Sequence, residues 1–234
     1  MGVKVKICGL TNLVDAQAAL VAGADLLGFI FFPRSPRYVK PERVREILRA
    51  LNPDRMAVIT VGVFVNESVE TIAQILDFCS LDVAQLHGEE LPGMLGLYGS
   101  PEGESEDRDP SPLRGRVYKA IRPRSAKEAA TLVGQYALPN SLRSGGQLPA
   151  FLLDAYHPQF RGGTGETGDW QLAGPLAVQH PLLLAGGLNP SNVAQAVRNV
   201  RPWGVDVASG VEKSPGQKEH CAMEALVKVV HNLR

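Results

Sequence analysis

The sequence of 234 residues has no long apolar run, no excess of charge of either sign and few cysteines. No run reaches the roughly 20 apolar residues of a membrane span, and the first residues lead into a strand without an apolar signal core. Lysine plus arginine equals aspartate plus glutamate at 24 each, so no net positive field attracts nucleic acid or an anionic membrane. We therefore expect a cytoplasmic protein whose anionic ligands are held by local donors.

Cysteine and histidine patterns argue against a disulfide framework and a metal site. The three cysteines, Cys8, Cys79 and Cys221, are odd in number and widely spaced. The five histidines show no H-x-x-x-H or similar spacing, so no metal ligand set is expected. No Walker-type G-K-[ST] pattern is present, which disfavours a P-loop nucleotide site.

Short apolar runs alternate with amphipathic segments along the chain. We expect each of the eight apolar runs to form a strand: Val3–Ile7, Leu26–Phe31, Ala57–Val65, Val83–Leu86, Val117–Ile121, Phe151–Leu153, Leu182–Ala185 and Val205–Ala208. Helical periodicity marks Asn12–Ala22, Glu42–Leu51, Val69–Phe78, Ala126–Gln135, Ser191–Val200 and Lys218–Leu233. This alternation predicts an α/β fold, a single (β/α)8 TIM barrel over residues 1–234, with its active site at the C-terminal face of the strands.

Three segments depart from the regular alternation. Residues 99–114 and 139–149 lack a periodic apolar face, and we expect them to be surface-loop insertions before the fifth and sixth strands, at the non-catalytic end. The sixth unit has Gly162-Gly163-Thr164-Gly165 after its strand. There we expect an extended loop and only a short helix near residues 169–172.

Cys8 and Asp154 are the candidate proton-transfer residues, because each ends an expected strand at the barrel mouth. A lone strand-end cysteine is more often structural than catalytic, but a nearby cation could make it a thiolate base. A carboxylate directly after the apolar Phe151–Leu153 is costly unless it is solvated, hydrogen-bonded or used in chemistry. Together they suit acid–base catalysis without a metal.

Two further polar residues follow other strands. Arg37 lies on the loop after the second strand, where its planar guanidinium could clamp a carboxylate, although a solvated surface arginine is an equal alternative. His87 ends the fourth strand and either orients a substrate or bonds a neighbouring loop.

Glycine-rich loops follow the last two strands. Gly187 lies after the seventh strand, and Ser209 and Gly210 lie after the eighth, where barrels commonly hold a phosphate with backbone N–H groups. Gly163, on the loop after the sixth strand, could add a donor or close over a ligand. Simple turns and helix punctuation are the alternative interpretation.

Eight motifs together carry a resemblance to one known family. They are Lys6-Ile7-Cys8-Gly9-Leu10-Thr11, Gly28-Phe29-Ile30-Phe31 with Ser35-Pro36-Arg37, Gly62-Val63-Phe64-Val65-Asn66, Gln85-Leu86-His87-Gly88, Leu153-Asp154, Gly162-Gly163-Thr164-Gly165, Ala185-Gly186-Gly187-Leu188 and Ser209-Gly210-Val211-Glu212. In this order, over nearly the whole chain, they resemble phosphoribosylanthranilate isomerase. The set is far more specific than any single motif.

The resemblance implies an Amadori rearrangement in tryptophan biosynthesis, which needs no cofactor and acts on a small phosphoribosyl substrate. It makes Asp154 the general acid and Cys8 the general base. It also implies that Arg37 grips the anthranilate carboxylate and that backbone N–H groups near Gly163, Gly187, Ser209 and Gly210 hold the phosphate. The motifs fit a monomer or a homodimer equally.

Three features depart from the family pattern. Ala208 stands where a second serine is more usual, Gly168-Asp169-Trp170 replaces Phe-Asp-Trp, and the two insertions are atypical. None removes a proposed catalytic residue, so we expect activity, with phosphate affinity the property most affected.

Two alternatives remain. The histidine-pathway aminoaldose isomerase carries out the same type of rearrangement. Members of that family have a pair of catalytic aspartates, whereas the first strand here ends in Cys8. A phosphate-binding barrel without catalysis is possible because fold does not fix function. The presence of both Cys8 and Asp154 argues against it.

Overall fold

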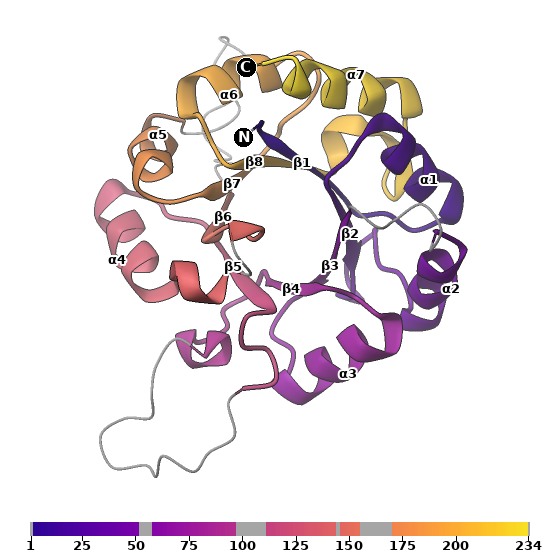
Figure 1. Ribbon diagram of the computed structural model, residues 1–234, viewed down its shortest axis with the longest axis horizontal. Helices are drawn as coiled ribbons and strands as arrows, with labels where there is room; N and C mark the ends of the chain where they lie inside the picture. Colours follow the sequence, from indigo (N-terminus) through magenta and orange to yellow (C-terminus); the bar gives the residue numbers. More distant parts are fainter. Residues whose placement is uncertain (1, 52–57, 97–110, 144–145, 155–169, 234) are drawn as a thin grey trace.

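The computed structural model describes residues 2–51, 58–96, 111–143, 146–154 and 170–233. Eight parallel strands close into a barrel in chain order, and β1 pairs with both β2 and β8. Figure 1 shows the strands as an inner ring with the helices outside it. The strands are β1(Lys4–Cys8), β2(Leu26–Ile30), β3(Ile59–Phe64), β4(Val83–Leu86), β5(Val117–Ile121), β6(Phe151–Asp154), β7(Leu182–Ala185) and β8(Gly204–Val207). The predicted TIM barrel is therefore confirmed.

The outer layer consists of helices that bury one face against the strands. The α-helices are α1(Leu13–Ala22), α2(Pro41–Leu51), α3(Val69–Cys79), α4(Ala126–Tyr136), α5(Trp170–Gln179), α6(Val193–Val200) and α7(His220–His231). The last of these, α7, packs against α1 and completes the ring. Within the described ranges, none of the helices has the length and apolar character needed to cross a membrane.

The structure corrects the sequence interpretation at two helices. A short helix was expected near residues 169–172, but α5 extends over ten residues, Trp170–Gln179. Trp170 and Ala173 are buried in the core, and this packing supports a helix that contains Pro175. The last helix was expected from Lys218, but α7 begins at His220 because Lys218 belongs to a small hairpin, β9(Glu212–Ser214) and β10(Gln217–Lys218).

Among the described residues, short 3₁₀ helices form at η1(Pro92–Leu95), η2(Asn140–Leu142) and η4(Ser209–Val211). Parts of both expected insertions belong to the described residues. Leu113 and Leu148, near their C-terminal ends, are buried, so the chain returns to the core before β5 and β6 begin. Residues 99–110 and 144–145 of these insertions lie outside the described ranges, and their interpretation as surface loops stays a prediction.

The barrel interior contains buried polar residues. Successive side chains of a strand point to opposite faces, so Lys6 and Cys8 share one face of β1 and Ile7 takes the other. Lys6 is in register with Asp206 on β8, and Gln85 on β4 is in register with Tyr118 on β5. TIM barrels usually fill this space with branched apolar residues. The polar filling points to a functional use of the strand ends.

Two glycines provide a matched test of the packing. At Gly204 an added Cβ would lie 2.9 Å from the Lys4 carbonyl oxygen, at the seam between β8 and β1. We expect Gly204→Ala to lower the free energy of unfolding by about 1–3 kcal/mol, because the strands would have to separate. At the exposed Gly134 inside α4, nothing lies within 4 Å of an added Cβ. There we expect Gly134→Ala to raise the free energy of unfolding by about 0.5–1 kcal/mol. Urea unfolding measures both changes, and equal effects would contradict the assigned packing.

Candidate active site

A cavity of about 710 Å³ opens at the C-terminal ends of the strands. It is lined by seven residues that the sequence singled out: Cys8, Arg37, His87, Asp154, Gly187, Ser209 and Gly210. These residues come from six different strands or from the loops that follow them, so barrel closure brings them together. The eighth predicted residue, Gly163, lies outside the described residues.

Cys8 ends β1 and is buried, with 5% of its surface exposed. Its sulfur packs on Gly28 of β2, where an added Cβ would lie 2.8 Å from Sγ, so only glycine leaves room for it. Burial raises the pKa of the Cys8 thiol, and the Asp206 carboxylate acts in the same direction. The ammonium groups of Lys6 and Lys218 act against this rise because they stabilise a thiolate.

The Lys6 side chain is fully buried below Cys8. Its Nζ donates to Gln85 Oε1 at 2.7 Å and lies 3.1 Å from Asp206 Oδ1. Burial by itself would lower the pKa of the Lys6 ammonium. The Asp206 carboxylate and the other nearby groups together outweigh the effect of burial, so the pKa of Lys6 is raised. Lys6 therefore stays protonated. The sequence analysis did not identify Lys6, Gln85 or Asp206 as site residues, although polar residues inside apolar strands were a usable signal.

Asp154 ends β6 and faces two basic side chains across the mouth. Its Oδ2 accepts from Arg122 Nε at 2.8 Å and lies 3.8 Å from His87 Nε2. Arg122 directly follows β5 and was missed by the sequence analysis, although it occupies a strand-end position like Asp154. Its side chain is 61% exposed, so it can leave the carboxylate at little cost.

The loop that carries His87 is fixed by a buried ion pair. Lys119 Nζ lies 3.2 Å from Glu90 Oε2 and donates to the Gly88 carbonyl at 2.8 Å. Glu90 in turn accepts from the backbone N–H groups of Gly88 and Asn66. At Gly88 an added Cβ would lie 2.3 Å from Asn66 Oδ1, so the two loops approach as closely as glycine allows.

Arg37 reaches the cavity from the loop after β2, but most of its guanidinium is already paired. Nε donates to both carboxylate oxygens of Glu212 at 2.9 and 3.0 Å, and Nη2 donates to Oε2 at 2.7 Å. Within the described ranges, no hydrogen bond or ion pair involves Nη1. Glu212 therefore occupies the Nε and Nη2 edge of the guanidinium that was predicted to clamp a carboxylate. Nη1 is the nitrogen available to a ligand.

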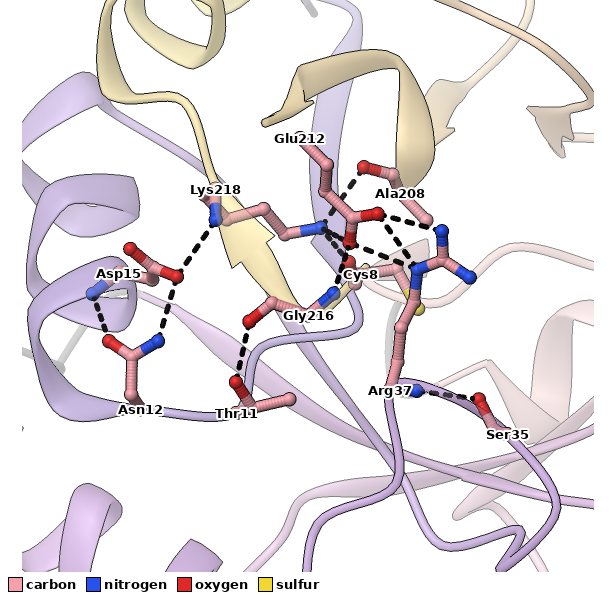
Figure 2. Close-up of polar contacts among 10 residues, drawn as sticks. All are labelled: Cys8, Thr11, Asn12, Asp15, Ser35, Arg37, Ala208, Glu212, Gly216 and Lys218. Atoms are coloured by element: carbon pink, nitrogen blue, oxygen red, sulfur yellow. Dashed lines mark hydrogen bonds and ion pairs between the residues drawn. The ribbon is translucent and has the colours of Figure 1, made fainter. Parts of the chain in front are cut away.

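Lys218 connects this ion pair to the ends of β1 and β8, as Figure 2 shows. Its buried Nζ donates to the Cys8 carbonyl at 2.6 Å, the Ala208 carbonyl at 3.0 Å and Glu212 Oε1 at 2.9 Å. Burial opposes ionisation of Glu212, but the bonds from Arg37 and Lys218 outweigh it and lower the pKa of that carboxyl. One ammonium thus joins the end of β1, the residue after β8 and the carboxylate that holds Arg37.

The hairpin carrying Lys218 is tied to the start of α1 (Figure 2). Asp15 Oδ2 accepts from the Lys218 backbone N–H at 2.9 Å and from Asn12 Nδ2 at 2.8 Å. Thr11 Oγ1 donates to the Gly216 carbonyl at 2.6 Å. The residues that follow β1 therefore hold the hairpin in place, and Lys218 of this hairpin in turn contacts Cys8.

The candidate phosphate loops lie against each other. Gly187 adopts a φ of 66°, in the left-handed region that favours glycine, and its carbonyl accepts from Asn192 Nδ2 at 3.0 Å. At Gly210 an added Cβ would lie 1.8 Å from the Leu188 carbonyl oxygen. No side chain fits there, so Gly210 is required for the loops after β7 and β8 to meet.

Comparison with known proteins identifies a matching family. Residues 5–98 and 127–229 match the family model of N-(5'-phosphoribosyl)anthranilate isomerase. The unmatched stretch between them contains the first predicted insertion, 99–114. A curated relative from Citrifermentans bemidjiense, named N-(5'-phosphoribosyl)anthranilate isomerase, is 46% identical over 92% of this chain and 91% of its own length.

Solved structures agree in both fold and family. Phosphoribosylanthranilate isomerase from Thermotoga maritima superposes with a TM-score of 0.77 at 37% identity, covering 99% of this chain and 100% of that one. A second isomerase structure, in complex with reduced 1-(o-carboxyphenylamino)-1-deoxyribulose 5-phosphate, has a TM-score of 0.75 at 35% identity, with 99% of this chain and 100% of that one covered.

The contacts of Lys218 predict a change in Cys8 reactivity. In Lys218→Met the ammonium that opposes the effect of burial is lost, so the pKa of the Cys8 thiol should rise further. Because alkylating agents react with the thiolate, the midpoint pH of Cys8 alkylation by iodoacetamide should move upward. Peptide mapping separates Cys8 from Cys79 and Cys221.

The exposed Lys213 on the same hairpin supplies the control. Lys213→Met keeps the hairpin and removes one positive charge, and the Cys8 midpoint should not move. The stated effect of Lys218 on the thiol would be wrong if folded Lys218→Met showed the parent midpoint.

Proposed function

This chain belongs to the N-(5'-phosphoribosyl)anthranilate isomerase family, and we propose that the cavity at its strand ends performs the family reaction with Cys8 and Asp154 as its proton-transfer groups. The protein is an isomerase of tryptophan biosynthesis. It converts N-(5'-phosphoribosyl)anthranilate to 1-(2-carboxyphenylamino)-1-deoxyribulose 5-phosphate by an Amadori rearrangement. The observation that carries the proposed residue roles is that Cys8 and Asp154 line the same cavity.

Asp154 acts first, as the general acid. It protonates the ribose ring oxygen as the C1'–O bond breaks, and the anthranilate nitrogen donates its lone pair to form a protonated Schiff base. Asp154 Oδ2 accepts from Arg122 Nε in the free protein, and the exposed Arg122 side chain can leave this contact when substrate binds.

Cys8 acts second, as the general base. Its thiolate removes the C2' proton, and the electron pair of that bond forms the enolamine and neutralises the nitrogen. Tautomerisation of the enolamine then gives the ketone. Lys6 and Lys218 support the thiolate against the effect of burial, which is how a desolvated cysteine can serve as a base here.

Local donors bind the two anionic ends of the substrate. Arg37 binds the anthranilate carboxylate through Nη1, with Glu212 holding the opposite edge of the guanidinium. Backbone N–H groups of Gly187, Ser209 and Gly210 bind the phosphate, with Gly163 as the remaining candidate. His87 contacts the substrate beside Asp154.

The cellular setting follows from the same features. A zero formal net charge and widely spaced cysteines support a cytoplasmic enzyme with a small-molecule partner. The same motifs fit either a monomer or a homodimer.

Replacing either proton-transfer group should remove most of the activity. We expect Cys8→Ala and Asp154→Asn each to lower kcat by about 10² to 10⁴-fold, because each loses one positioned proton-transfer group. The assay follows loss of anthranilate fluorescence from freshly generated substrate. Cys221→Ala, at the exposed cysteine of α7, is the control and should retain the parent rate. Parent rates in folded Cys8→Ala and Asp154→Asn would refute the mechanism.

Arg37 should affect binding more than the chemical step. We expect Arg37→Met to raise KM by about tenfold or more while kcat falls less, because the carboxylate contact is made in both the ground state and the transition state. Arg34→Met changes an exposed arginine on the same loop and should leave KM unchanged. A kcat effect larger than the KM effect would place Arg37 in the chemistry instead.

A further inference from the structure

A line of hydrogen bonds crosses the barrel interior from Lys6 to His87. Lys6 Nζ donates to Gln85 Oε1 at 2.7 Å, and the other end of the same amide, Nε2, lies 2.8 Å from His87 Nδ1. Gln85 is 1% exposed and Lys6 is fully buried, so the bond between them is shielded from solvent. Gln85 is thus the buried connection between the Cys8 side of the site and the Asp154 side.

The orientation of the Gln85 amide is decided by its neighbours. A lysine ammonium has three donors and no acceptor, so the Gln85 atom that faces Lys6 must be the carbonyl oxygen. Tyr118 reinforces this choice, because its hydroxyl donates to the same Oε1 at 2.8 Å. Burial raises the pKa of Tyr118, which keeps the phenol protonated and able to donate. The amide NH₂ must therefore face His87.

This orientation fixes the position of the imidazole proton. An amide nitrogen only donates, so His87 Nδ1 must accept, and a neutral ring then carries its proton on Nε2. We propose that Gln85, held by Lys6, is a positioning residue that keeps His87 in the Nε2–H tautomer, so that the ring donates a hydrogen bond into the cavity.

His87 Nε2 faces one acceptor and one donor in the structure. Asp154 Oδ2 lies 3.8 Å away, and Arg122 Nη2, which can only donate, also contacts Nε2. A neutral imidazole has one acceptor nitrogen, so it cannot accept from both Gln85 and Arg122. Gln85 is buried and held by Lys6, whereas the Arg122 side chain is 61% exposed. Arg122 is therefore the group that moves, leaving Nε2–H to meet a carboxylate or substrate oxygen. This catalytic use rests on the proposed function, whereas the tautomer is a property of the free protein.

Nitrogen NMR of the free protein tests the tautomer directly. Uniform ¹⁵N labelling with long-range ¹H–¹⁵N correlation distinguishes a protonated from an unprotonated ring nitrogen, and His87→Gln identifies the His87 signals among the five histidines. At a pH where the ring is neutral, we expect Nδ1 to give the unprotonated signal and Nε2 the protonated one. The reverse pattern in the parent protein overturns the proposal, whatever the activity.

Two variants separate positioning from simple packing. Gln85→Glu has nearly the same shape but presents an oxygen to Nδ1, so we expect a proton to appear on Nδ1. Tyr118→Phe removes one donor to Oε1 and leaves Lys6 in place, so the Nε2–H tautomer should persist. Loss of the Nε2–H tautomer in Tyr118→Phe would contradict the assignment of orientation to Lys6. Thermal unfolding of each variant confirms that the fold is retained.

Kinetics then test the consequence for the reaction. We expect Gln85→Glu to lower kcat/KM by about tenfold to a hundredfold, as loss of a charged or well-placed hydrogen bond does. A merely structural role predicts no change in the Nδ1 signal, and that result in folded Gln85→Glu overturns the proposal. If the tautomer switches but kcat/KM keeps the parent value, the proposed use of Nε2–H in catalysis is wrong and the positioning role of Gln85 stands. If Cys8→Ala is also fully active, the proposed mechanism fails separately.

Discussion

The buried ammonium of Lys218 is the contact on which the geometry of the site depends. It donates to the carbonyl groups of Cys8 and Ala208 and to the carboxylate of Glu212, which in turn holds Arg37. An ammonium without these partners would be very costly to bury, so the three segments must converge on it. This constraint ties the proposed proton-transfer residue Cys8, the proposed substrate clamp Arg37 and a candidate phosphate loop to one point.

A second buried lysine extends the same principle into the barrel. Lys6 is balanced by Asp206 and bonded to Gln85, so protein groups compensate its charge inside the strands. Buried ion pairs contribute little net stability compared with apolar packing. We infer that both lysines serve the site, because each places a positive charge beside the Cys8 thiol. The apolar surface between strands and helices supplies most of the stability.

The fold was predictable from sequence to a large extent because its signals are local. Apolar runs and helical periodicity gave every strand of the barrel within about two residues. They gave most helices equally well, and Trp170–Gln179 and the hairpin at Glu212–Lys218 were the exceptions. Both exceptions depend on tertiary contacts. The helix containing Pro175 relies on core packing, and the hairpin relies on the bond from Lys218 to Asp15.

The sequence by itself determined that Cys8, His87 and Asp154 share one mouth, because parallel strands in a barrel all end at the same face. Only the tertiary structure decided which distant side chains and backbone groups pair around that mouth. Arg37 pairs with Glu212 across 175 positions, Lys218 reaches Cys8 across 210, and Lys6 reaches Gln85 across 79. Periodicity records which face a residue occupies. The pairing of two distant side chains depends on strand register and loop path, which no local pattern contains.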